Sequence, residues 1–263
     1  MKLRELWQFR YLVGLYVYRD FVVHYKQTIL GPLWWLFQPL FATGMFTVVF
    51  SMIAKLPTDS LPPSLFYLSG LIVWNFFSQS LLHTAQTFLD HKEVFKKVYF
   101  PRLVVPVAAV LSNLMRFVLQ FSLFVLFYLI FLGRGVALTP HWTILLLPLL
   151  LLYVAMLAFG MGITVAAVTT KYRDLALVLP FFVQFGMFVS VVIYPLSQVP
   201  PAWQFWFSLN PMVPPIELFR FMFFGVGGVD TAALLIGIAL TLVIFLVGMF
   251  AFNRAESTFA DTI

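Results

Sequence analysis

Long uncharged stretches alternate with short charged ones along the 263 residues of this chain. No Asp, Glu, Lys or Arg lies between Lys26 and Lys55, or between Asp59 and Asp90. Each interval holds one helix of about 20 residues, which is the length that crosses the hydrocarbon of a bilayer. The pattern therefore predicts two membrane-spanning helices, at residues 34–54 and 65–86.

Four further intervals are uncharged or nearly so, and they predict the third to sixth spans within residues 103–133, 141–170, 175–194 and 231–253. Arg116 is the one charged residue inside them. Between the fifth and sixth spans, residues 195–228 are apolar and aromatic but are interrupted repeatedly by proline and glycine. Because such a sequence does not form one straight spanning helix, we expect a re-entrant pair of short helices there.

Composition agrees with a polytopic membrane protein. Hydrophobic residues make up 62% of the chain and charged residues 10%, with a mean hydropathy of +0.98. These values lie outside what a soluble domain presents to water. We therefore predict an all-α fold with one membrane domain over residues 1–263, in which residues 1–31 form a cytoplasmic interfacial helix and elbow and residues 32–263 form the six-helix bundle.

Positive charge is unevenly distributed between the two sides of this predicted bundle. With the amino terminus inside, twelve Lys and Arg residues fall on inner segments and three on outer segments. Inner loops of membrane proteins are enriched in Lys and Arg, so both termini are expected in the cytoplasm. The formal net charge of +6 follows from this topology, and no stretch combines dense basic residues with the polar surface that nucleic acid requires.

The first thirty residues predict an elbow from the membrane surface into the first span. Residues 2–26 mix aromatic and apolar side chains with scattered charges, as does a helix that lies in the headgroup layer. Gly31 and Pro32 then permit a change of direction, and Trp34 and Trp35 follow where indole N–H groups stay near water. The candidate residues of this elbow are Arg19, Tyr25, Lys26, Gly31 and Pro32.

The sequence offers no chemistry for binding a cofactor. It has no GxxxxGK[ST] phosphate loop, no cysteine, and no histidines or carboxylates at metal-ligand spacing. Carboxylates are nearly absent from the spans, whereas proton-driven or sodium-driven carriers usually place one near the midplane. We therefore expect no cofactor on this chain and a partner that supplies energy.

The loop DHKEVFKKVYFPR, residues 90–102, is the longest charged inner connection. One interpretation is that its basic residues do no more than set the topology. A second interpretation is a short helix that docks a cytosolic subunit, with apolar anchors among basic neighbours. The candidate docking residues are Phe95, Lys96, Lys97, Val98, Tyr99 and Phe100.

Five segments in order carry a resemblance to a known family. They read RDFVVHYKQTILGPLWWLFQPL, KVYFPR, KYRDLALVLPF, LNPMVPPIELFRFMFFG and ESTFADTI. Together they resemble the permease subunits of bacterial ABC exporters for cell-surface polysaccharides of the O-antigen, capsule or teichoic acid type. The resemblance covers essentially the whole chain.

The resemblance implies a homodimer in the bacterial cytoplasmic membrane, bound to two copies of a separate ATPase that uses ATP and Mg. Such exporters move an undecaprenyl-pyrophosphate-linked glycan. By this similarity, residues 19–38 are the gate helix with its elbow, residues 90–102 the coupling helix, and residues 203–225 the re-entrant outer hairpin. The nearest rival is a drug or lipid exporter of the same architecture. From another class, a membrane enzyme acting on lipid-linked sugars needs clustered catalytic acids, which the ten dispersed Asp and Glu residues do not supply.

A glycan conduit is expected to be aromatic and nearly free of charge, because sugar faces stack on aromatic rings. Aromatic residues recur at helical spacing in the first and fifth spans. The conduit candidates are Trp34, Phe37 and Phe41 in the first span and Phe181, Phe185 and Phe188 in the fifth. The alternative for each of these side chains is packing or contact with lipid.

Three charged residues in apolar segments are further candidates. Arg116 either bonds backbone carbonyls and snorkels, or contacts the pyrophosphate or an internal carboxylate. Glu217 and Arg220 are three residues apart, which places them on one helix face as an ion pair. We expect this pair to be an internal structural one, with stabilisation of a gate as the alternative.

Overall fold

The computed structural model describes residues 7–25, 31–91, 94–95, 100–228 and 230–261. Every regular element within these residues is a helix, so the predicted all-α class is confirmed. The elements are α2 (Arg10–Tyr25), η1 (Gly31–Leu33), α3 (Trp34–Phe46), η2 (Thr47–Ile53), α4 (Pro63–Ala85), α5 (Thr87–Asp90), α7 (Val104–Gly133), η3 (Trp142–Leu146), α8 (Leu147–Thr169), α9 (Asp174–Val189), η4 (Leu196–Gln198), α10 (Pro201–Ser208), α11 (Val213–Phe224) and α12 (Thr231–Asp261).

Among the described residues, five helical segments are long and apolar enough to cross a membrane. They cover residues 31–53, 63–85, 104–133, 142–169 and 231–255. Each begins and ends within three residues of a predicted span. Length and hydropathy therefore mark this chain as an integral membrane protein.

The predicted fifth span differs from the observed helix. The sequence pattern predicts a span within residues 175–194, whereas α9 is an apolar helix of 16 residues that ends at Val189. This helix is shorter than the roughly 20 residues that usually cross a bilayer. The chain turns after it instead of continuing as a helix, and the count of six spans stays a prediction.

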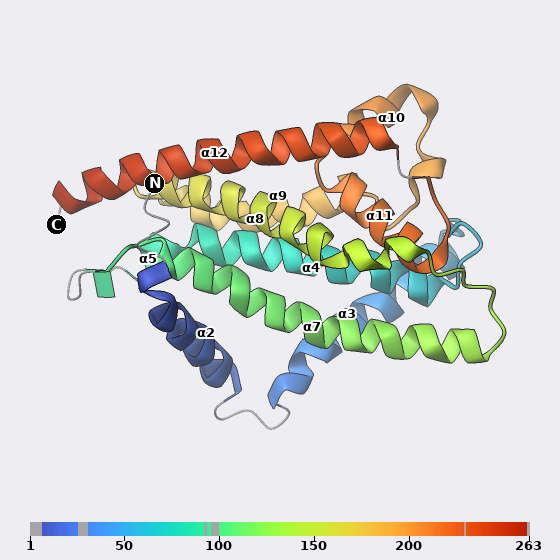
Figure 1. Cartoon of the computed structure of the whole chain (residues 1–263). Coiled ribbons are helices and arrows are strands. Elements are labelled where there is room, and N and C mark those ends of the chain that lie inside the picture. The colour runs from blue at the N-terminus through green and yellow to red at the C-terminus, as the bar shows by residue number, and fades with distance from the viewer. Residues whose placement is uncertain (1–6, 26–30, 92–93, 96–99, 229, 262–263) are drawn as a thin grey trace.

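Helix α4 is the centre of the bundle. It contacts α3, α7, α8, α9 and α11, and Figure 1 shows it enclosed between α7 and α8. Of the five candidate spans it is the least hydrophobic and the most buried. Low hydropathy in the most buried span is expected in a membrane, because a helix surrounded by protein does not have to be soluble in lipid, whereas α12 does.

Helices α8 and α12 form the most extensive helix pair and approach closely through glycine. A Cβ atom on Gly160 would lie 2.7 Å from the backbone Cα of Phe245, and one on Gly248 would meet the carbonyl oxygen of Gly160. Small residues at membrane helix contacts allow such backbone approach, which strengthens van der Waals packing. The two helices are therefore in direct backbone contact.

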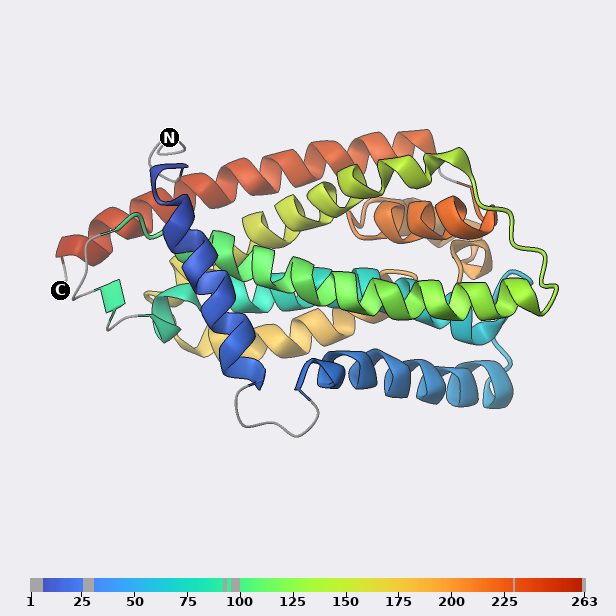
Figure 2. The same ribbon diagram turned by 60° about the horizontal axis from the view of Figure 1, so that its bottom comes forward.

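Short helices close the two ends of the bundle. Two of them, α10 and α11, lie between α9 and α12 in the chain, within residues 195–228, and their re-entrant arrangement in a membrane stays a prediction. At the opposite end, α2 lies below the long helices in Figure 1 and crosses in front of them at a steep angle in Figure 2, and the end of α12 lies at this same end in both views. The predicted interfacial helix thus corresponds to α2, whose axis runs at a steep angle to the axes of the long helices.

Replacement of Gly160 by alanine tests the contact between α8 and α12. The added methyl group meets backbone that cannot rotate away, so we expect Gly160→Ala to destabilise the protein by about 1–3 kcal/mol, as overpacking does. Gly14→Ala is the matched control, because a methyl group added at Gly14 would have no neighbouring atom within 4 Å. The control should gain up to about 1 kcal/mol from helix propensity. Thermal unfolding of the purified protein in detergent measures both, and equal unfolding temperatures for the two variants would contradict the contact.

Candidate functional site

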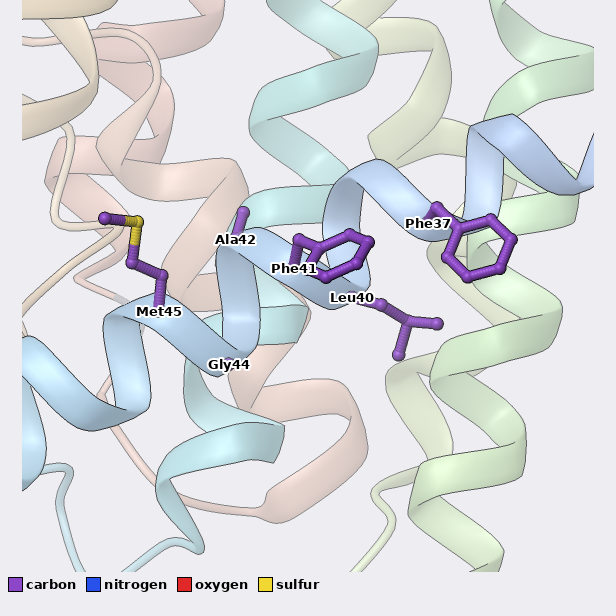
Figure 3. A pocket seen from close by; sticks show the side chains of 6 residues that line it. All are labelled: Phe37, Leu40, Phe41, Ala42, Gly44 and Met45. Atoms are coloured by element: carbon purple, nitrogen blue, oxygen red, sulfur yellow. The ribbon is translucent and has the colours of Figure 1, made fainter.

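The aromatic row of the first span lies on the outer surface of α3. Trp34 and Phe37 have ring centroids 5.9 Å apart, and Phe37 stacks on Phe41 at 6.0 Å. Phe41 is 71% exposed in the single subunit. Figure 3 shows Phe37, Phe41 and Met45 on successive turns of α3, where they line an open groove. The predicted row is thus a continuous aromatic surface.

The second aromatic row lies on α9 and is also uncovered. Phe181, Phe185 and Phe188 are all exposed, and Phe182 adds a further exposed ring. Both α3 and α9 pack against α4, and Figure 2 shows both of them below α4. The structure therefore places the two predicted rows on separate helices that flank one central helix.

Arg116 does not join these aromatic rows. Its guanidinium carbon lies 4.7 Å from the centroid of the Trp35 ring, between α7 and α3. The neighbouring Gln120 donates a hydrogen bond to the carbonyl oxygen of Trp35 at 3.3 Å. Arg116 is thus directed toward the interior of the subunit, where a cation over an aromatic face is favourable.

Glu217 and Arg220 form the predicted pair. Arg220 donates to a Glu217 carboxylate oxygen at 3.1 Å, and both side chains are buried, with Arg220 only 3% exposed. Arg220 also donates to the carbonyl oxygens of Val191 at 2.8 Å and Val192 at 3.0 Å. The guanidinium lies over the ring of Phe66 on α4, 3.7 Å from its centroid. One side chain of α11 thus holds both α4 and the turn after α9.

This arginine explains why α9 ends early. Val191 has a backbone φ of +50°, an unfavourable conformation for a β-branched residue. The chain adopts it where Arg220 donates hydrogen bonds to the carbonyl oxygens of Val191 and Val192, which a continuing helix would otherwise pair with backbone N–H groups. On α4, Gly70 provides the space, since a Cβ there would lie 2.9 Å from an Arg220 nitrogen. The carboxyl-terminal end of α9 is therefore fixed by side-chain hydrogen bonds.

The loop after α4 packs against both ends of the chain. On α5, Phe88 stacks on Phe252 of α12 with centroids 4.8 Å apart. Of the docking candidates, Phe95 and Phe100 are described, with centroids 5.5 Å apart, and Phe100 is buried next to Tyr16 of α2. The other docking candidates lie outside the described residues: Lys96, Lys97, Val98 and Tyr99. Phe100 therefore attaches the loop to α2 in this structure.

Helix α2 meets the same loop through Arg19. Arg19 pairs with Asp20 at 2.8 Å, covers the ring of Tyr16, and lies 3.2 Å from Nε2 of His91. Burial lowers the pKa of His91 below its ordinary value, and the positive charge of Arg19 lowers this pKa further. His91 is therefore neutral at physiological pH and accepts a hydrogen bond from Arg19.

The elbow after α2 has the predicted conformation at its end. Gly31 has a φ of +50°, in the region that favours glycine, and Pro32 lies in the short helix η1 that leads into α3. Tyr25 is the last residue of α2, and Lys26 lies outside the described residues. Glycine at Gly31 thus permits the change from the direction of α2 to that of α3.

Sequence reasoning did not predict a row of polar side chains inside the subunit. Asn75, Gln79, His83 and Gln86 recur every three or four residues on α4 and just after its end. This spacing places them on one helix face. The signal was present in the sequence, but uncharged polar residues do not interrupt a hydrophobic interval in a count of charges.

Comparison with known proteins identifies the family. A family model described as ABC-2 type transporter matches residues 11–224. This chain belongs to the ABC-2 type transporter family. As a member of that family it is a transport subunit rather than an enzyme, and it associates with an ABC ATPase. The resemblance to permeases of ABC exporters is thereby confirmed.

Curated relatives of this ABC-2 chain are similar over nearly their whole length. An O-antigen export system permease protein RfbA from Myxococcus xanthus is 27% identical over 262 residues, which is 99% of this chain and 98% of the relative. Two proteins of the same name from Klebsiella pneumoniae are 23% and 24% identical, with 99% of each chain covered. The likeness therefore extends from α2 to α12.

The buried arginine of this ABC-2 chain gives a stability prediction. Arg220→Gln removes both carbonyl contacts and leaves the Glu217 carboxylate buried without its cation, so we expect a loss of about 3–5 kcal/mol. In the double variant Glu217→Gln with Arg220→Gln, part of this loss should be recovered. Arg134→Gln, on an exposed loop, is the control and should change stability by less than about 0.5 kcal/mol. Chemical unfolding in detergent measures these values; a double variant no more stable than Arg220→Gln would contradict the pairing.

His91 gives a pH prediction. Because its pKa is lowered in the folded state, the unfolded chain takes up the proton more readily, and stability falls as the pH drops below the ordinary histidine value of about 6.5. Protonation also sets a second positive charge beside Arg19. We expect the thermal unfolding temperature to drop between pH 7.5 and pH 5.5 by less in His91→Gln than in the unaltered protein. His141→Gln, at the opposite end of the bundle, should retain the full drop; the same drop in His91→Gln would exclude this role.

Proposed function

We propose that this chain is the permease subunit of an ATP-driven exporter that moves lipid-linked polysaccharide of the O-antigen type across the bacterial cytoplasmic membrane. Undecaprenyl pyrophosphate is the proposed lipid carrier. The permease acts as a homodimer with both termini in the cytoplasm. ATP and Mg bind to two copies of a separate ATPase subunit. Three relatives named as O-antigen export permeases, each matched over 98% or more of its length, support this assignment.

The observation that carries the proposal is the pair of uncovered aromatic rows on α3 and α9. Phe41 is 71% exposed and Phe185 is 68% exposed, and Asp174, at the start of α9, is the one charged side chain on these two helices. Aromatic rings bind the apolar faces of sugars without fixing them by charge. Such a surface lets a long polar polymer slide, which export of a glycan requires.

A second copy of this chain is the partner proposed for this surface. Helix α3 is the least buried of the candidate spans, and it continues into the π-helical segment η2. Irregular helical turns of this type are frequent at functional sites. When two subunits turn these faces toward each other, their aromatic rows enclose one passage on the twofold axis. The ATPase then opens and closes it by moving the two halves.

Loss of the aromatic row on α9 tests the transport role. In cells that depend on this chain for surface polysaccharide, we expect Phe181→Ala with Phe185→Ala to lower surface polysaccharide about tenfold or more, because sugar stacking is lost. Leu145→Ala with Leu149→Ala is the matched control, since these two side chains are also exposed but belong to a segment without an aromatic row. Polysaccharide export that persists in the phenylalanine variant, while export of a lipid or drug is impaired, would assign the chain to another branch of the family.

Cross-linking between subunits tests the proposed dimer face. The chain has no cysteine, so a single introduced cysteine is its only thiol and any disulfide between two copies forms at that position. We expect Met45→Cys on α3 to form a disulfide between two copies in membranes, and Leu149→Cys on α8 to remain monomeric in the same assay. The reverse pattern would place the dimer contact on α8.

A further inference from the structure

Two rows of polar side chains face each other inside the subunit. One row, on α4 and just after its end, consists of Asn75, Gln79, His83 and Gln86, and the other, on α7, consists of Ser112, Asn113, Arg116 and Gln120. The Nδ2 atom of Asn75 lies 3.5 Å from Oε1 of Gln120, and the Nδ2 atom of Asn113 lies 3.2 Å from Nδ1 of His83. The rows therefore run together from one end of the two helices to about the middle of α4.

Two adjoining cavities follow these rows. The larger has a volume of about 290 Å³ and is closed on one side by Tyr16, Arg19 and Asp20 of α2. The smaller has a volume of about 90 Å³ and is covered by Trp35 and Gln38 of α3. Arg116 lines both cavities, so they meet at its side chain. We call the two cavities together the polar cleft.

One atom beside the polar cleft requires a partner that the described part of the chain does not supply. The Oδ1 atom of Asn113 is buried without a hydrogen bond to any described residue. Buried polar atoms in native proteins are paired with protein or with ordered water. A cavity that is polar and large enough for water normally contains it. The geometry and the pairing rule thus both call for water at this place.

We propose that the polar cleft is a water-binding site, open to the cytoplasm beside α2, and that α2 and α3 form its removable cover. Water fills the cleft from the ends of α4 and α7 inward to Gln120. Each subunit then holds a hydrated space of its own, which reaches about halfway along the central helix.

Where the cover borders the polar cleft, its contacts are mainly polar. Ser112 donates to the Asp20 carboxylate at 3.3 Å, Gln120 donates to the Trp35 carbonyl at 3.3 Å, and Arg116 lies against the Trp35 ring. Water can replace each of these polar partners when the helices separate. The tightly packed contact between α4 and α8 offers no such replacement. Away from the cleft, α2 and α3 also pack through apolar side chains, such as Val13 of α2 against α7 and Phe46 of α3 against Tyr67 of α4.

The polar cleft is separate from the proposed glycan passage. Trp35 faces the cleft, whereas Phe37 and Phe41 lie on the exposed side of the same helix. Residues two apart in a helix point in nearly opposite directions. The inference therefore does not depend on the exported substrate.

Cysteine labelling tests the water in the cleft. Ser112→Cys changes one atom type in the wall of the larger cavity, and Met115→Cys, one turn further along α7 and 48% exposed on the outer surface, is the matched control. Both variants are assembled with the partner ATPase in inside-out vesicles and treated with a charged, membrane-impermeant methanethiosulfonate. A thiol reacts as the thiolate, which requires water, so we expect Ser112→Cys to react about tenfold faster than Met115→Cys or more. Equal rates would overturn the proposal.

A second variant tests the cover. We expect Gln79→Cys, in the smaller cavity, to react several-fold faster when Trp35→Ala removes the ring above it. Gln86→Cys, in the larger cavity, is the control and should react at the same rate with and without Trp35→Ala. An unchanged rate there indicates that Trp35→Ala leaves the protein folded. An unchanged rate at Gln79→Cys would show that α3 is not the cover. Polysaccharide export measured on the same variants is a separate readout, so a failure of the export proposal leaves the labelling result interpretable.

Discussion

The enclosure of α4 by protein on all sides is the constraint on which the rest of the structure depends. In a bilayer, a helix that carries Asn75, Gln79 and His83 is costly unless other helices cover it. Five neighbours do so, and their positions follow from this requirement. The most apolar helix, α12, is consequently left at the outside, where lipid is its solvent.

A single buried arginine adds the carboxyl-terminal end of α9 to this arrangement. Arg220 reaches from α11 to the carbonyls of Val191 and Val192 and to the ring of Phe66. The opposite end of the bundle is held differently, by aromatic contacts that join the loop after α4 to α2 and α12. The start of α3 is held through Trp35, whose ring contacts Phe21 of α2 and lies beneath Arg116 of α7.

Sequence alone predicts the spans well, because the thickness of the bilayer fixes how long a charge-free interval must be. It predicts the pair of Glu217 and Arg220 because their spacing is local. It fails at the end of α9, since the acceptor carbonyl of Val191 lies 29 residues from Arg220 and nothing in the local composition distinguishes a buried turn from a helix. The direction of Arg116 is likewise set by Trp35, on a different helix, which hydropathy does not reveal.

The glycine contact between α8 and α12 has a mechanical consequence. Two helices whose backbones touch at Gly160 and Gly248 cannot slide or roll without atomic overlap, so they behave as one rigid beam. Helices α2 and α3 take no part in this contact, because they pack on α7 and on α4 and α7, respectively. A displacement of α2 and α3 relative to the bundle therefore leaves the contact between α8 and α12 intact.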